Sequence, residues 1–152
     1  MSEQSSEIER NRAELKRMRA IVTRLDDEEL SRPVNESWTV AGVLAHVAFW
    51  DGRALFLVEK LVRGEPLSPS DEEPEDVDWI NDATRPLIHA IPPRRAADLA
   101  LSLAEAVDER LASLKPELVR KTWPSDPTSP VNASRAEHRG EHLDEIEASL
   151  RN

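Results

Sequence analysis

The sequence contains no cysteine among its 152 residues. This absence excludes disulfide bonds, thiolate metal sites, iron–sulfur clusters and a cysteine nucleophile. Glycine is scarce, with 4 residues, and the longest uncharged segment, residues 37–50, is shorter than the roughly 18 to 20 apolar residues that a membrane-spanning helix needs. The polar residues 1–7 lack the pattern of a signal peptide. We therefore expect one cytoplasmic domain over residues 1–152, with no membrane association.

Basic residues are also in short supply. The chain has 20 Lys and Arg against 30 Asp and Glu, which gives a formal net charge of -10. A strongly acidic chain is repelled by the phosphate backbone of nucleic acids and by anionic membranes. The small basic pairs Arg94–Arg95 and Arg120–Lys121 do not offset this repulsion. The charge therefore argues against a nucleic-acid partner.

Proline divides the chain, because it ends or kinks helices. The 11 prolines leave four long proline-free segments, at residues 1–32, 34–65, 94–115 and 131–152. Each segment carries apolar residues at helical spacing, and none shows a convincing strand pattern. Four amphipathic helices predict an all-α protein, a four-helix bundle, and the long connections predict two crossover loops.

Local signals indicate where helices begin and end. Ser6 and Glu9 form a capping-box pattern in the first segment. Thr39 can cap the second helix, which is the most apolar and should end at Gly64. A short additional helix is expected at about residues 78–90.

The two long loops are expected at residues 64–76 and 115–130. The first holds six acidic residues and three prolines without a basic residue, and the second holds four prolines. The acidic segment lacks the alternating oxygen ligands and central glycine of an EF-hand. It is therefore interpreted as a solvated crossover and not as a calcium loop.

The 4 histidines are the main side chains left for chemistry near neutral pH. His46 lies within the apolar stripe of the second helix and should point inward. His138 and His142 are four residues apart, so they lie one turn apart on a helix face that Ile146 continues into the core. His89 has no spaced partner and is interpreted as a surface or packing residue.

Three imidazoles in one bundle core need a common partner, because each unsatisfied ring costs roughly 1 to 3 kcal/mol to bury. A divalent metal such as zinc, nickel or iron accepts neutral imidazole, and three protein ligands leave positions open for water or substrate. The hypothesis is a metal site formed by His46, His138 and His142. The alternative is a solvent-facing pair, with His46 hydrogen-bonded to a backbone or side-chain group.

The residues around His138 and His142 limit the classes of reaction that the site could catalyse. Arg139 stands where an HExxH motif has its general-base glutamate, so peptidase chemistry of that type is not indicated. Glu141 and Glu145 have two interpretations: groups that orient ligands or transfer protons, or charges on a solvent-facing side of the helix.

Three separated segments carry a family resemblance: ESWTVAGVLAHV at residues 36–47, DWIN at 78–81 and HRGEHLDEI at 138–146. They resemble, respectively, the tryptophan-led start of helix two with its inward histidine, an Asp-x-x-Asn sequence, and an HxxxH sequence before a hydrophobic residue. The family is the DinB/YfiT-like superfamily of metalloproteins, which includes mycothiol-dependent maleylpyruvate isomerases and bacillithiol transferases.

The resemblance implies a four-helix bundle with two long crossovers, often a homodimer, in which His46, His138 and His142 hold a divalent metal. It further implies a thiol-dependent S-transferase or isomerase. In such an enzyme a low-molecular-weight thiol bound at the metal attacks a small electrophile. The resemblance assigns no catalytic residue in this chain. The lack of cysteine is compatible with an imported thiol.

Other functions stay open at this point. A metal-activated water could hydrolyse a small molecule, with Glu141 moving protons. The chain could also be a stress-associated bundle without enzymatic activity, one that binds a metal or ligand or only dimerises. Trp38, Trp50 and Trp123 are candidates to line a pocket, and plain core packing is the alternative for each.

Overall fold

The structure is a computed structural model that describes residues 3–68, 76–122 and 131–151. These residues form helices and contain no named strand, which confirms the prediction of an all-α protein. The helices are α1 (Glu3–Arg24), α2 (Asp27–Leu30), α3 (Val40–Val62), α5 (Val77–His89), α6 (Pro93–Ala112), α7 (Pro116–Thr122) and α8 (Arg135–Leu150).

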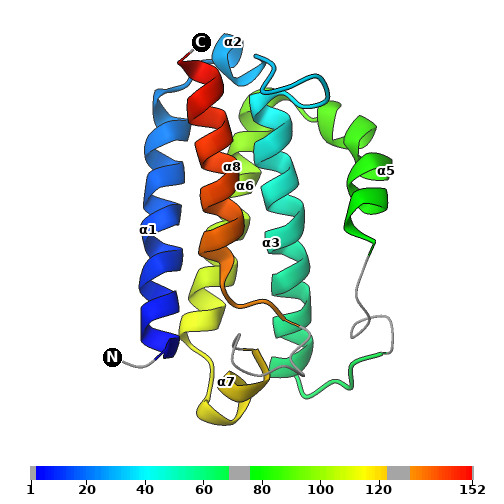
Figure 1. Cartoon of the computed structure of the whole chain (residues 1–152). Helices are drawn as coiled ribbons and strands as arrows, with labels where there is room; N and C mark the ends of the chain where they lie inside the picture. Colours follow the sequence, from blue (N-terminus) through cyan, green and yellow to red (C-terminus); the bar gives the residue numbers. More distant parts are fainter. Residues whose placement is uncertain (1–2, 69–75, 123–130, 152) are drawn as a thin grey trace.

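The long helices α1, α3, α6 and α8 lie side by side (Figure 1). α1 contacts α6 and α8, and α3 contacts the same two helices, so the four enclose a common core. α5 packs against the outer side of α3. This arrangement places α3 and α8, the two helices that carry the predicted metal ligands, next to each other.

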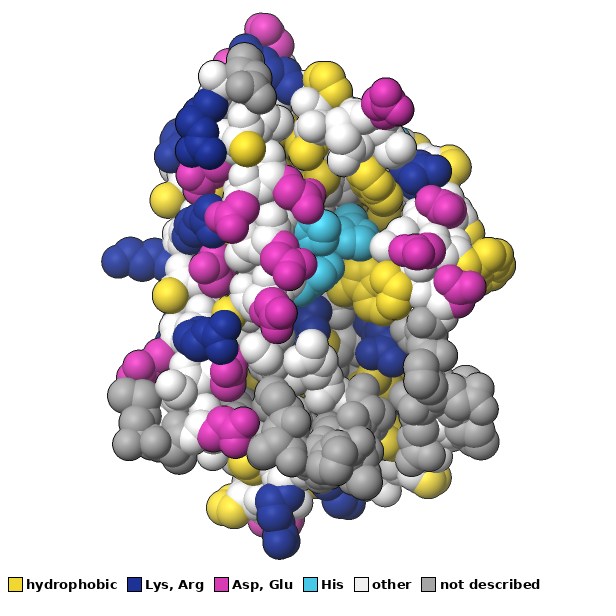
Figure 2. Space-filling view, in the orientation of Figure 1, with side chains coloured by type: hydrophobic (Ala, Val, Ile, Leu, Met, Phe, Trp, Pro, Cys, Tyr) yellow, Lys and Arg dark blue, Asp and Glu magenta, His cyan; other side chains and the backbone are white. Residues whose placement is uncertain are grey.

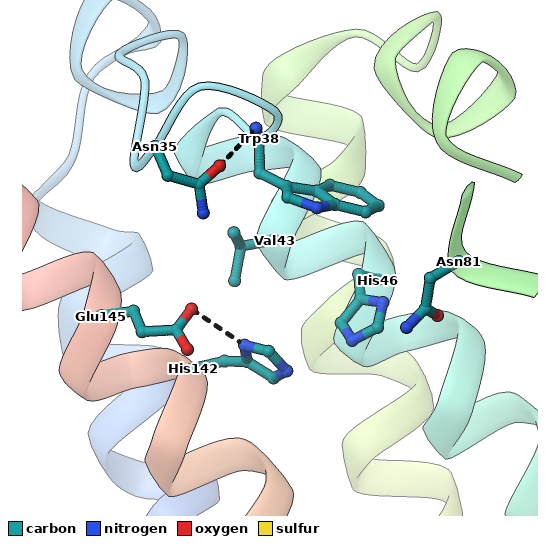
Figure 3. A pocket seen from close by; sticks show the side chains of 7 residues that line it. All are labelled: Asn35, Trp38, Val43, His46, Asn81, His142 and Glu145. Atoms are coloured by element: carbon teal, nitrogen blue, oxygen red, sulfur yellow. Dashed lines mark hydrogen bonds and ion pairs between the residues drawn. The ribbon is translucent and has the colours of Figure 1, made fainter. Parts of the chain in front are cut away.

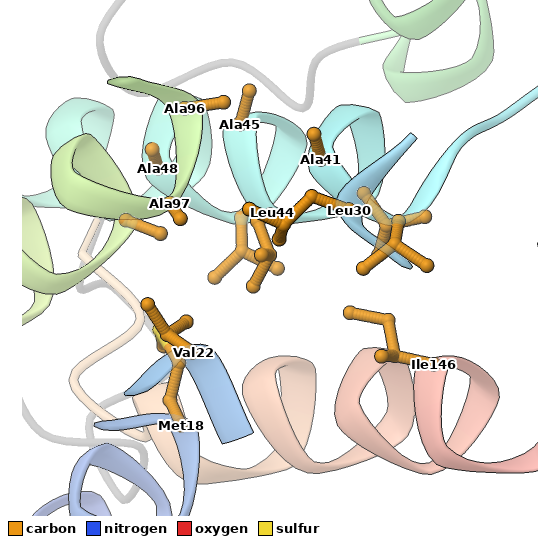
Figure 4. Close-up of a cluster of buried hydrophobic side chains, with 14 of the residues drawn as sticks. Met18, Val22, Leu30, Ala41, Leu44, Ala45, Ala48, Ala96, Ala97 and Ile146 are labelled. Carbon is orange, nitrogen blue, oxygen red and sulfur yellow. The ribbon is translucent and has the colours of Figure 1, made fainter. Parts of the chain in front are cut away.

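The core between α3 and α6 is built largely from alanine (Figure 4). Small side chains allow two helices to approach closely, and larger residues from α1, α3 and α8 then fill the centre of the bundle. The buried alanines of this interface are Ala41, Ala45, Ala48, Ala96, Ala97, Ala100 and Ala104. The larger buried side chains include Met18, Val22, Leu44 and Ile146.

Helix α3 begins as the sequence predicts. The Thr39 hydroxyl accepts a hydrogen bond from the backbone N–H of Gly42 at 3.0 Å. The helix ends at Val62, and Gly64 follows with a φ of 71°, a left-handed conformation that favours glycine. By length and composition α3 is the one helix in the described residues that could cross a membrane, but 67% of its most apolar stretch is buried in the bundle.

The N-terminal segment differs from the prediction. Helix α1 begins at Glu3, upstream of Ser6, so Ser6 is not its cap. The capping box lies instead at Asp26 and Glu29, where it starts the short helix α2. Residues 1–32 therefore do not form a single helix.

The second predicted loop, residues 115–130, is also corrected. Its first part forms helix α7, with Pro116 at the first helical position, where proline is tolerated because no N–H is needed there. Proline breaks a helix in its interior, but at the first position, as with Pro116, it starts one. Residues 69–75 of the first predicted loop, and Trp123 with residues 124–130 of the second, lie outside the described residues.

Candidate metal centre

The structure brings the three predicted ligands together between α3 and α8, where they form one histidine patch on the surface of the bundle (Figure 2). The ring centroids of His46 lie 5.3 Å from His138 and 4.8 Å from His142, and the last two rings are 4.7 Å apart. Their potential ligand nitrogens all lie within 4.8 Å of one another. The geometry therefore favours convergence over a separate solvent-facing pair.

Burial keeps two of these rings neutral. It lowers the pKa of His46 to about 4, with a further contribution from His142. Burial, followed by His142, lowers the pKa of His138 to about 3. Neutral imidazole is the form that binds metal ions, so both rings are ready to act as ligands at neutral pH without losing a proton.

Hydrogen bonding shows that the cluster is incomplete by itself. The Nδ1 atom of His138 is buried and has no hydrogen-bond partner among the described residues. The Nδ1 atom of His142 lies 3.2 Å from a carboxylate oxygen of Glu145, an arrangement that orients metal-binding histidines. Three converging imidazoles, one of them with an unsatisfied buried nitrogen, fit a divalent cation that prefers imidazole.

A cavity of about 230 Å³ lies beside the histidines (Figure 3). It is lined by Asn35, Trp38, Val43, His46, Asn81, His142 and Glu145. Trp38 stands against His46, with ring centroids 5.5 Å apart. Trp50 does not line the cavity, but its ring N–H donates a hydrogen bond at 3.0 Å to Asn81, which does. Of its two interpretations, pocket lining and plain core packing, Trp38 therefore fits the first.

Two other predicted residues lie away from the cavity. His89 is exposed and packs against Trp38, with ring centroids 5.3 Å apart, so its interpretation as a surface or packing residue agrees with the structure. A Cβ atom at Gly42 would lie 2.5 Å from Nε2 of His89, so glycine permits this close approach. Glu141 is exposed and is not among the residues that line the cavity.

A second polar cluster, which is not among the sequence-based predictions, is buried inside the bundle. The Arg139 side chain is 0% exposed and donates to both carboxylate oxygens of Asp108, at 2.9 and 2.8 Å. Its Nε atom donates to Asp51 at 3.0 Å, and Arg135 donates to the other oxygen of Asp51 at 2.8 Å. Two positive and two negative side chains thus balance within the core.

The charges in this cluster hold Arg139 in its ionised form. Burial by itself would lower the pKa of Arg139, but the charge of Asp51 and the hydrogen bonds to Asp108 raise it. Backbone carbonyls of α1 and α6 accept further hydrogen bonds from the same guanidinium. The buried ion cluster is therefore complete without any ligand.

Asn11 of α1 connects this cluster to the start of α8. Its side-chain oxygen accepts hydrogen bonds from the backbone N–H groups of Arg135 and Ala136, both at 2.9 Å. Its amide donates to the carbonyl of Ala133 at 3.0 Å. Ser134, the residue before the helix, makes no capping hydrogen bond with its side chain. A residue from another helix thus caps the helix that carries two of the three histidines.

The comparisons with known proteins point to one family. A family model described as the mycothiol maleylpyruvate isomerase N-terminal domain matches residues 11–147, a range that includes all three clustered histidines. The searches of curated proteins and of solved structures gave no match.

Proposed function

We propose that this chain, which belongs to the mycothiol maleylpyruvate isomerase N-terminal domain family, a DinB-like family, is a metal-dependent enzyme. In this proposal His46, His138 and His142 hold one divalent cation: zinc, nickel or iron. One observation carries it. Imidazoles from two helices meet at one point, and one of them has a buried nitrogen that no described residue satisfies.

The residues around the histidines support nucleophilic chemistry on a small molecule. A divalent metal at this site supplies a nucleophile at neutral pH, because it lowers the pKa of a bound thiol or water. Glu145 orients His142 through its hydrogen bond, and Trp38 and Val43 supply apolar lining to the cavity. The cavity of about 230 Å³ suits a small substrate.

We propose thiol-dependent transfer or isomerisation of a small electrophile as the specific activity. The family description supports this choice. The lack of cysteine is compatible with it, since any sulfur nucleophile must then be a low-molecular-weight thiol from solution. Such a thiol would be a co-substrate and not a resident cofactor.

Hydrolysis of a small molecule is the second candidate, and the position of Glu145 favours it. This carboxylate lines the cavity and contacts a histidine, so it can accept a proton from water. Glu141, the acid that the sequence suggests for this role, does not line the cavity, whereas Glu145 does.

Two further proposals concern the topology of the helix bundle and the oligomeric state. We propose that α1, α3, α6 and α8 form a DinB-like four-helix bundle, with the α3–α5 and α6–α8 connections as crossovers. The contacts among these four helices support it. We further propose that the chain acts as a homodimer in the cytoplasm, without nucleic-acid or membrane partners.

Elemental analysis of the purified full-length protein tests the metal site. We expect about one metal ion per chain in the wild type and in His89→Ala, a control that removes a histidine outside the cluster. The double variant His138→Ala, His142→Ala should lose the metal. Equal metal content in all three proteins would rule out the site.

Activity measurements with and without an added low-molecular-weight thiol separate the two reactions. Turnover of an electrophile that requires the thiol, and is lost in the double variant, supports transfer or isomerisation. Turnover of an ester without thiol supports hydrolysis. A protein that holds its metal and turns over neither substrate would favour a non-enzymatic binding function.

A further inference from the structure

The side-chain amide of Asn81 has a fixed orientation in the cavity. The ring N–H of Trp50 can only donate, so the atom of Asn81 that it meets at 3.0 Å must be the oxygen. The amide nitrogen therefore points the other way, toward His46 (Figure 3). Asn81 presents a hydrogen-bond donor beside the histidine cluster.

Asn35 has the same kind of constraint on the opposite side of the cavity. Its side-chain oxygen accepts hydrogen bonds from the backbone N–H groups of Ser37 and Trp38, at 2.8 and 2.9 Å. This Asx turn uses the oxygen and leaves the amide nitrogen directed into the space beside Val43 (Figure 3). Both cavity asparagines thus have an occupied acceptor and an available donor.

Neither amide nitrogen has a protein partner within residues 3–68, 76–122 and 131–151. The one carboxylate in the cavity lining, from Glu145, is engaged with His142. The ring of Trp38 forms a firm apolar wall, because His46, His89 and the guanidinium of Arg85 pack around it. The cavity therefore combines amide donors with a flat apolar surface.

We propose that the amide groups of Asn81 and Asn35 form a subsite for the acceptor oxygens of a small organic ligand. The ligand carries a carboxylate or carbonyl group, and its apolar body packs against Trp38. The Asn81 amide binds an oxygen next to the histidines, and Trp50 acts as a positioning residue that keeps this amide from rotating. The inference rests on the proposed function only in assuming that the ligand reacts at the histidines. Binding of the ligand to the two amides requires no metal.

Titration of the full-length protein with benzoate tests the subsite, with the asparagine side-chain NH₂ signals followed by NMR in isotope-labelled protein. We expect the signals of Asn81 and Asn35 to shift with one common dissociation constant. The buried amide of Asn11, which donates to Ala133, serves as an internal reference and should not shift. Benzylamine, which has a similar shape and a donor in place of the acceptor, should leave the cavity signals unchanged.

Two isosteric variants remove the donors while keeping the internal hydrogen bonds. In Asn81→Asp and Asn35→Asp the oxygen still accepts from Trp50 or from the Asx turn, but no amide N–H remains. Because aspartate also adds a negative charge that would itself repel benzoate, the variants are compared with neutral acetophenone, whose carbonyl oxygen can accept the same hydrogen bonds. Each variant should weaken acetophenone binding about tenfold or more. Asn132→Asp is the matched control, because Asn132 accepts a hydrogen bond from the Ser134 backbone at 3.0 Å in a similar turn that does not line the cavity.

The inference would be overturned by unchanged affinity in both cavity variants, by an equal loss in Asn132→Asp, or by benzylamine shifting the same signals. The titration is performed with zinc and again after chelator treatment. Benzoate binding that survives metal removal, together with a protein that fails the elemental analysis, would retain the subsite and reject the metal site. Trp50→Phe should weaken acetophenone binding less than Asn81→Asp does, since it frees the amide without removing it.

Discussion

Helix α8 carries two polar clusters that differ in one respect. The ion cluster of Arg135 and Arg139 with Asp51 and Asp108 satisfies its own charges inside the core. The histidine cluster, whose rings come from the same helix and from α3, leaves a buried nitrogen of His138 without a partner among the described residues. Buried polar groups are normally hydrogen-bonded, and an exception calls for an explanation.

The two clusters differ in whether a bound ligand could stabilise them. A cluster that is complete without a ligand gains nothing from one, and this cluster joins α8 to α3 and α6 through its hydrogen bonds. A cluster that is incomplete gains stability from whatever completes it. The two clusters alternate along α8, so the helix that the ion cluster fixes also sets where His138 and His142 point.

The largest expected effect comes from breaking the ion cluster. Arg139→Met keeps an apolar side chain of similar length but leaves Asp51 and Asp108 buried without their shared partner. The free energy of unfolding should fall by about 3 to 5 kcal/mol, as for other broken buried ion pairs. Urea unfolding measures this loss.

The exposed pair on α1 supplies the control for that measurement. Arg10 contacts Glu7 at 2.7 Å, but its side chain is 56% exposed. Arg10→Met should cost about 0.5 kcal/mol or less. Similar losses for the two variants would contradict the distinction between a buried cluster and a surface pair.

Metal addition should stabilise only the incomplete cluster. At a free zinc concentration about 100 times the dissociation constant, the free energy of unfolding of the wild type should rise by about 2.7 kcal/mol. His138→Leu removes the unsatisfied nitrogen, so without metal it should be at least as stable as the wild type, and zinc should add almost nothing.

Thermal or urea unfolding with and without zinc checks this prediction. His89→Leu, which changes the histidine packed on Trp38, should gain as much from zinc as the wild type does. A gain of the same size in His138→Leu would show that zinc binds elsewhere.

The cap of α8 should contribute less than either the ion cluster or the metal. Asn11→Ala removes the oxygen that accepts from Arg135 and Ala136, so it should cost about 1 to 2 kcal/mol. Ser134→Ala should cost less, although Ser134 occupies the usual capping position, because its hydroxyl donates to Glu7 instead. Urea unfolding of both variants decides this, and the reverse order would refute the assignment of the cap to Asn11.

Sequence patterns predicted several features that depend on local chemistry, although the Ser6–Glu9 capping pattern was wrong. Thr39 caps α3 through a bond to a residue three positions away, and the i, i+4 spacing of His138 and His142 places them on adjacent turns. The inward position of His46 followed from the apolar stripe around it. Each of these inferences needs only the neighbours along one helix.

The partners within the ion cluster could not be predicted from neighbours along one helix. Arg139 and Asp51 are 88 residues apart, and charged residues are ordinarily solvent-exposed. One signal was present in the sequence of α8. The helix has too few apolar residues for a continuous core-facing stripe, and at helical spacing the stripe of Leu143 and Ile146 continues into Arg139 and Arg135. His138 and His142 lie beside this stripe, only partly buried, and not at its centre.

The cap that Asn11 provides makes the histidine site depend on a contact between residues far apart in the sequence. The amide of Asn11 and the first N–H of α8 are separated by 124 residues, so their contact closes a loop across most of the chain. Ser134 supplies no side-chain cap, so the first N–H groups of α8 are satisfied by Asn11 only when α8 packs against α1. The helix that carries two of the three histidines is therefore completed by a contact with α1, which carries none of them.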